Sequence, residues 1–154
     1  MIRTDAEYEA ALEQIAEDKA NEPRLREHFA SQGFTPAQVD DLMEPILTFQ
    51  QQVEEEVEEY QRLKQGIIDD LTDLQYLGRH LVALRIARGL TQRQLAERMG
   101  VHESQVSRDE RNEYFNITVQ RAARVLKAIG AEIHGKVQLL PAPTAGDQPV
   151  HLPA

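Results

Sequence analysis

The chain has 154 residues, no cysteine and a formal net charge of -9 at pH 7. Without cysteine it can form neither a disulfide framework nor a thiolate metal site. No window approaches the roughly 18 consecutive apolar residues of a membrane span, and the first residues lack the apolar core of a signal peptide. We therefore expect a soluble, cytoplasmic protein that has no membrane partner and folds as one or two compact units.

The charge is unevenly distributed along the chain. From Leu81 to Lys136 there are ten Lys and Arg against six Asp and Glu, whereas the remainder holds seven basic and 20 acidic residues. Phosphate binding needs local positive charge rather than a positive total. Only this middle segment is therefore predicted to approach a nucleic acid.

Residues 1–66 are predicted to be helical. Thr4 and Glu7 have capping-box spacing and begin a first helix, which the sequence Asn21-Glu22-Pro23 should break. Pro23 should then start a short helix that ends near Gly33. Thr35 should cap a long helix, bent or split by Pro45.

An apolar stripe runs along this long helix at steps of three and four residues. Its members are Val39, Leu42, Ile46, Phe49, Val53, Val57, Tyr60 and Leu63. Such a stripe indicates burial against the first helices or a second subunit. The acidic run at residues 54–59 has two interpretations: a solvated helix face, or a negative surface for a basic partner.

A second helical segment follows Gly66 and makes the whole chain all-α. Helices are expected from about 67 to 88, from Thr91 to Met99 and from about 103 to 111, with Gly100 supplying the sharp turn between the last two. A helix, a glycine turn and a second helix with a polar, basic outer face is typical of DNA binding. Residues 67–135 are the predicted helix-turn-helix domain, and residues 136–154 are a mostly disordered tail.

The sequence LRIARGLTQRQLAERMGVHESQVSRDER resembles the phage-repressor-like (Cro-type, xenobiotic-response-element) helix-turn-helix family. The likeness continues through VQRAARVLKAIG and implies a lambda-repressor-like domain of four to five helices. It also implies an ion pair between Arg85, at the end of the first helix of that domain, and Glu110, at the end of its third helix. Two features depart from the family: Asp109 replaces an apolar residue, and residues 112–115 replace a glycine-rich loop, where Tyr114 and Phe115 are expected to pack as an aromatic plug.

The resemblance also implies which residues contact DNA. Thr91, Gln92, Arg93 and Arg111 fall at phosphate-contacting positions. Gln105 and Ser104 are the expected base readers, because a glutamine amide can bond adenine at two points. Arg108 could bond guanine or phosphate, and Glu103 could read cytosine or cap its helix. The predicted outer face is completed by His102 and Ser107.

No enzyme signature accompanies this motif. The five histidines are scattered, without the spacing of a helical metal pair, and there is neither a phosphate-binding loop nor a nucleophile elbow. We expect no catalytic residue, no metal and no cofactor.

Two functions fit the pattern best, and a pure protein-interaction module, in which the same helices would be scaffold, is a third class. The first is a homodimeric transcriptional regulator, such as a repressor, that reads a double-stranded operator with the helix around residues 103–111. The second is the antitoxin of a toxin-antitoxin pair, which binds its toxin protein and its own operator. The start IRTDAEYEAALEQI resembles the N-terminal segment of host-inhibition-of-growth antitoxins.

Overall fold

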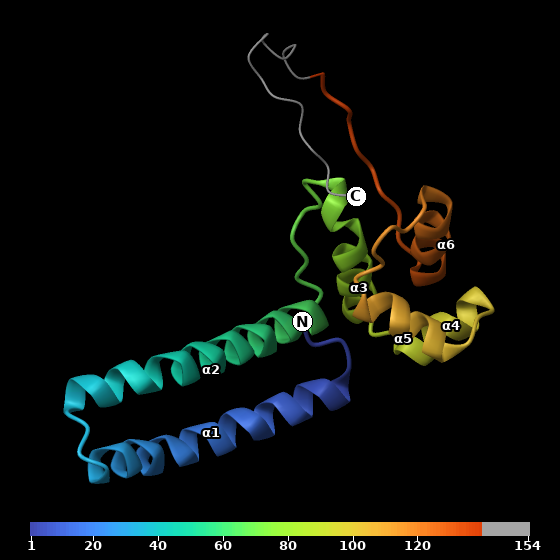
Figure 1. The fold of residues 1–154 in the computed structure, drawn as a ribbon. Helices are drawn as coiled ribbons and strands as arrows, with labels where there is room; N and C mark the ends of the chain where they lie inside the picture. Colours follow the sequence, from blue (N-terminus) through green and yellow to red (C-terminus); the bar gives the residue numbers. More distant parts are fainter. Residues whose placement is uncertain (140–154) are drawn as a thin grey trace.

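The computed structural model describes residues 1–139, and in that range every element is helical (Figure 1). The all-α prediction is confirmed for these residues. The elements are α1 (Asp5–Ser31), α2 (Pro36–Lys64), the 3-10 helix η1 (Leu74–Tyr76), α3 (Leu77–Ala87), α4 (Gln92–Met99), α5 (Glu103–Arg111) and α6 (Val119–Ile129). Most of the predicted tail, residues 140–154, lies outside the described range. No helix within residues 1–139 has the length and apolarity to span a membrane.

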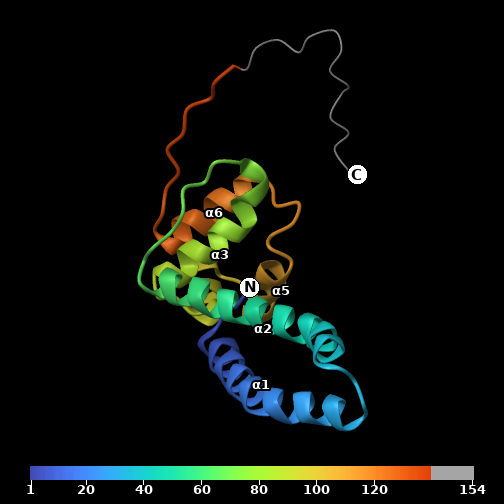
Figure 2. The same cartoon turned by 90° about the vertical axis from the view of Figure 1, so that its left-hand side faces the viewer.

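Helices α1 and α2 form an antiparallel hairpin that projects from the other helices (Figures 1 and 2). The predicted break at residues 21–23 is wrong, since Pro23 lies inside α1, and Pro45 does not split α2. A proline removes one backbone hydrogen bond and crowds the carbonyl four residues earlier. Both prolines are on exposed sides of their helices, where that carbonyl can be hydrated.

The predicted apolar stripe of α2 divides into two faces. Val39, Val57, Tyr60 and Leu63 are buried as expected, together with Met43 and Gln50, which the prediction omitted. Three predicted stripe members are instead exposed: Leu42, Ile46 and Phe49. Because a helix turns about 100° per residue, an irregular three-and-four pattern can cover two neighbouring faces. The hairpin therefore retains an uncovered apolar row.

The N-terminal residues join the hairpin to the other helices. Ile2 lies in the same buried cluster as Val57 and Leu81. The N-terminal amine is 2.7 Å from the Glu56 carboxylate. The carbonyl of Arg3 accepts a 2.8 Å hydrogen bond from Arg85. The two halves of the chain thus share one hydrophobic core.

A polar contact closes the same junction. Asp5 accepts hydrogen bonds from Lys64 at 2.9 Å and from the Tyr60 hydroxyl at 3.0 Å. These hydrogen bonds hold the pKa of Asp5 below its usual value. Burial, with Asp5 nearby, raises the pKa of Tyr60. Tyr60 is therefore a neutral hydrogen-bond donor at neutral pH.

Helix α3 begins later than predicted. Residues 67–73 are not helical, and the Asp73 side chain accepts a 2.9 Å hydrogen bond from the Gln75 backbone, which starts η1. Asp side chains that bond nearby backbone groups compete with a continuing helix. Leu74 is consequently exposed, whereas Leu81 and Ile86 are buried.

Candidate nucleic-acid interface

Local hydrogen bonds define both ends of α4 and the start of α5. The Thr91 hydroxyl accepts from the Gln94 backbone at 3.1 Å, and the Gln94 side chain accepts from the Thr91 backbone at 2.9 Å. Gly100 ends α4 with φ of 67°, a left-handed conformation that glycine adopts without steric cost. His102 caps α5 by accepting from the Ser104 backbone at 3.2 Å. Gly100 thus ends α4, and α5 begins three residues later.

A buried ion pair holds this unit against α3. The Glu110 carboxylate receives hydrogen bonds from Arg85 Nε at 2.6 Å and from Arg85 Nη2 at 2.8 Å. The Gln92 amide also donates to Glu110, at 2.9 Å. Arg85 in turn donates to the Leu90 carbonyl at 2.7 Å. One carboxylate therefore connects α3, α4 and α5.

This geometry changes the expectation for Gln92. The resemblance implied that its side chain contacts phosphate, but its amide points inward to Glu110 and the residue is half-buried. The first turn of α4 still carries backbone N–H groups with no partner inside the helix, and these favour an anion. Any phosphate contact at this position would use the backbone rather than the amide.

The outermost row of α5 consists of Ser104, Arg108 and Arg111. All three are exposed, and their spacing of four and three residues places them on one side, opposite Val106 in the core. Within residues 1–139, neither guanidinium has an ion pair or a side-chain hydrogen bond. Two cations and a hydroxyl are therefore presented to solvent by a fixed helix.

The remaining predicted contacts lie beside this row. Glu103 and His102 are exposed at the start of α5, and Arg93 is exposed on α4, where it pairs with Glu97 at 3.2 Å. Gln105 and Ser107 are half-buried rather than fully outward. Gln105 precedes the buried Val106 by one residue and Ser107 follows it, so both side chains are turned about 100° around the helix axis from the side of α5 that faces the core.

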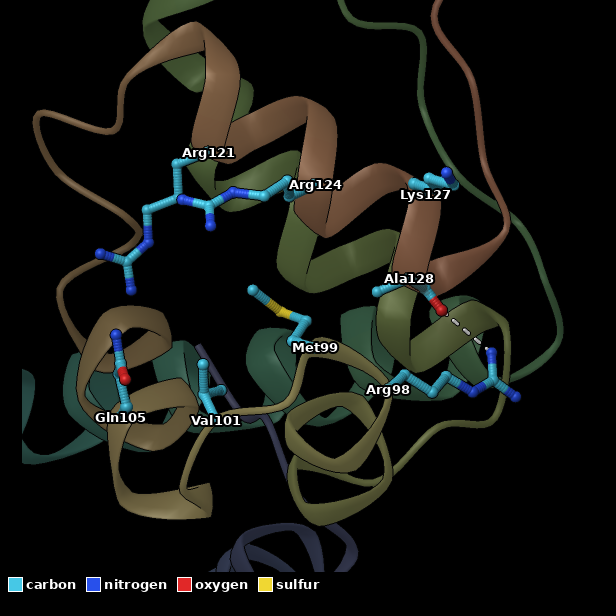
Figure 3. Close-up of a pocket in the computed structure, with 8 residues that line it drawn as sticks. All are labelled: Arg98, Met99, Val101, Gln105, Arg121, Arg124, Lys127 and Ala128. Atoms are coloured by element: carbon cyan, nitrogen blue, oxygen red, sulfur yellow. Dashed lines mark hydrogen bonds between the residues drawn. The ribbon is translucent and has the colours of Figure 1, made fainter.

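Gln105 faces α6. It lines a cleft with Arg121 and Arg124, and Figure 3 shows its side chain on the wall opposite these two arginines. No residue of α6 was among the contact residues predicted from the sequence. The spacing of Arg121, Arg124 and Lys127 at three-residue steps was the signal that could have identified them.

The loop between α5 and α6 follows the prediction in part. Tyr114 is 5% exposed and belongs to the core, whereas Phe115 is 80% exposed. The expected plug therefore contains one aromatic ring only. Asp109, which replaces the usual apolar residue, pairs with Arg121, so a contact between charges links α5 to α6 there.

The acidic run of α2 is largely neutralised by neighbouring cations. Glu54 lies 2.7 Å from the Lys19 ammonium, Glu56 contacts the N-terminal amine, and Glu59 lies 2.8 Å from Arg79. Three of its five carboxylates thus belong to ion pairs. In the described part of the chain, no group of three or more His, Asp or Glu side chains is placed to hold a metal ion.

Comparison with known proteins identifies the segment that carries this geometry. A family model described as helix-turn-helix matches residues 81–134, which include α4, α5 and α6 and most of α3. Residues 81–134 are a helix-turn-helix domain. No curated protein and no solved structure matches the chain. The helix-turn-helix match agrees with the resemblance seen in the sequence and indicates a DNA-binding transcription regulator.

Proposed function

We propose that this protein is a sequence-specific transcription regulator that places α5 in the major groove of operator DNA. The observation that carries the proposal is the exposed row of Ser104, Arg108 and Arg111 on a helix held by the buried Arg85–Glu110 pair. The major groove admits an α-helix and presents a different donor and acceptor pattern for each base pair.

The geometry supports different roles along the surface. Arg108, at the middle of the exposed row, is the first candidate for a guanine contact, with Ser104 beside it. Arg111 and Arg93 lie at the margins and suit phosphate contacts. Gln105 is at the side of α5 that faces α6, so it is a secondary candidate for base contact.

The experiment that tests the proposal is selection of bound DNA from a random pool with the full chain. We expect one enriched sequence. Arg108→Ala should then weaken binding to that sequence by about 1–3 kcal/mol, while binding to scrambled DNA changes little. Arg111→Ala should weaken binding to both DNAs and make the salt slope shallower by about one unit.

Arg24→Ala is a matched control, because it removes one exposed arginine from α1, away from α5 (Figure 1). It should leave both affinities unchanged. A pool that yields no enriched sequence would contradict the proposed function. Equal loss on both DNAs in Arg108→Ala would remove this residue from base recognition.

The operator complex is proposed to contain a homodimer. One helix-turn-helix unit covers few base pairs, and a two-fold pair doubles the site. The exposed apolar row of α2, Leu42, Ile46 and Phe49, offers a surface that a second copy can cover. Phe49→Glu should convert a dimer into a monomer in sedimentation and lower affinity for a palindromic operator. A wild-type chain that is monomeric at micromolar concentration would contradict the dimer.

An antitoxin is the second candidate function, and two features favour it. The first residues resemble host-inhibition-of-growth antitoxins, and residues 1–66 carry 16 Asp and Glu against six Lys and Arg beside the exposed apolar row. Such a surface suits a small basic toxin. If this function is correct, the protein should relieve growth arrest caused by the product of an adjacent gene. An adjacent product that causes no arrest, or arrest that persists, would exclude it.

A further inference from the structure

A cleft of about 530 Å³ lies between α4, the start of α5 and α6 (Figure 3). Four basic side chains line it: Arg98, Arg121, Arg124 and Lys127. The volume is within the range of sites for small molecules, roughly 300–1,000 Å³. The concentration of cations in a concave surface attracts anions more strongly than the same charges on a convex one.

The cations of the cleft are only partly neutralised. Arg121 pairs with Asp109, and Arg98 donates to the Ala128 carbonyl at 3.0 Å. Among residues 1–139, Arg124 and Lys127 have no ion pair and no side-chain hydrogen bond. The cleft therefore contains at least two cations that can bind a ligand without first breaking a contact.

The rest of the cleft wall is apolar. Met99, Val101 and Ala128 are half-buried and border it. Figure 3 shows Met99 between the two walls, pointing toward the arginines of α6. A methionine thioether is polarisable and adapts its shape to aromatic groups. An apolar floor under a cationic rim fits a ligand with an apolar ring and an attached anionic group.

DNA phosphate fits this site less well. The cleft reaches α5 at Gln105, which is turned about 100° around the helix axis from the buried Val106. The exposed row that includes Ser104 and Arg108 lies on the opposite side of α5 from Val106. A phosphate backbone also gains nothing from covering Met99 and Val101. We propose that this cleft is a binding site for a small aromatic anion, separate from the DNA-contacting row.

Full-length protein titrated with 1-anilinonaphthalene-8-sulfonate, followed by fluorescence, tests the site without DNA. We expect saturable binding that weakens at least tenfold in the double variant Arg124→Ala/Lys127→Ala. Both side chains are exposed, so the variant should fold normally, as circular dichroism can verify. The matched control, Arg24→Ala/Lys136→Ala, removes one exposed arginine and one exposed lysine elsewhere and should bind as wild type.

A neutral analogue, N-phenyl-1-naphthylamine, separates charge from apolar contact. It should bind the wild type at least tenfold more weakly than the sulfonate. Equal affinity for the two dyes would overturn the proposal, because the cations would then contribute nothing. The same conclusion would follow if the cleft variant and its control bound the sulfonate equally, since the dye would then occupy another apolar surface.

Occupation of the cleft should also affect DNA binding, and this step rests on the proposed function. An anion that contacts Arg121 competes with Asp109, which frees a carboxylate near the end of α5 and disfavours phosphate nearby. The sulfonate should therefore lower operator affinity severalfold, and saturating operator should lower sulfonate affinity by the same factor. No mutual effect would overturn the coupling alone, whereas complete mutual exclusion would show that DNA occupies the cleft.

Discussion

The buried ion pair makes a quantitative prediction about stability. Glu110→Leu removes the acceptor of three hydrogen bonds and leaves the Arg85 cation with only the Leu90 and Arg3 carbonyls. Both partners are almost fully buried, with side-chain exposures of 3% for Arg85 and 0% for Glu110. Breaking such a pair from one side costs about 3–5 kcal/mol. For a chain of this length the melting temperature should fall by roughly 10 °C.

The double variant Arg85→Met/Glu110→Leu separates the cost of an unpaired charge from the value of the pair. With both charges removed, the main remaining cost is that the Leu90 and Arg3 carbonyls lose the hydrogen bonds that Arg85 donates, about 2 kcal/mol together. The double variant should therefore be more stable than either single variant by about 1–3 kcal/mol. Urea unfolding of all four proteins measures this cycle. Additive losses would refute the reasoning, because they would mean that neither single variant leaves a buried unpaired charge.

Two further predictions concern the loop after α5. A Cβ atom added to Gly78 would overlap the Glu113 carbonyl oxygen, so Gly78→Ala should destabilise the fold by about 1–3 kcal/mol. A Cβ atom added to Gly135 meets no described residue, so Gly135→Ala should be neutral in the same unfolding assay. A loss in neither variant would show that the loop moves freely. Among residues 1–139 the buried Tyr114 hydroxyl has no hydrogen-bond partner, so Tyr114→Phe should stabilise by about 1 kcal/mol. Tyr60→Phe removes the hydrogen bond from the Tyr60 hydroxyl to Asp5 and should destabilise the fold by about 1 kcal/mol. Equal changes in unfolding free energy for the two Tyr variants would contradict this difference between a paired and an unpaired hydroxyl.

The parts of the domain that sequence predicts well are those governed by local chemistry. Thr91 caps α4 through a hydrogen bond three residues away, and Gly100 ends it by adopting a conformation disfavoured for other residues. These preferences act between neighbours in the chain and need no knowledge of tertiary structure. The order and approximate limits of α4 and α5 were therefore predictable.

The failures arise where distant contacts decide. A helix can continue through Pro23 when the proline is on the side of the helix that faces water, as it is here. The burial of Leu42 depends on which face of α2 packs against α1. The orientation of Gln105 was also missed, because a polar residue beside Val106 can face either solvent or α6. Periodicity indicates that a helix has a buried face but does not identify which neighbouring helix covers it.

The same limit applies to charge, and it bears on DNA binding. The sequence indicated a solvated face or a negative surface for the acidic run, yet Glu54, Glu56 and Glu59 each face a cation supplied by another part of the chain. Paired carboxylates project little field beyond a Debye length of about 8 Å at physiological salt. The arginines of α5, in contrast, have no internal partner among the described residues. A strongly acidic chain can therefore present two unpaired arginines on one helix to DNA, because three carboxylates of its acidic run are paired with the N-terminal amine, with α1 or with α3.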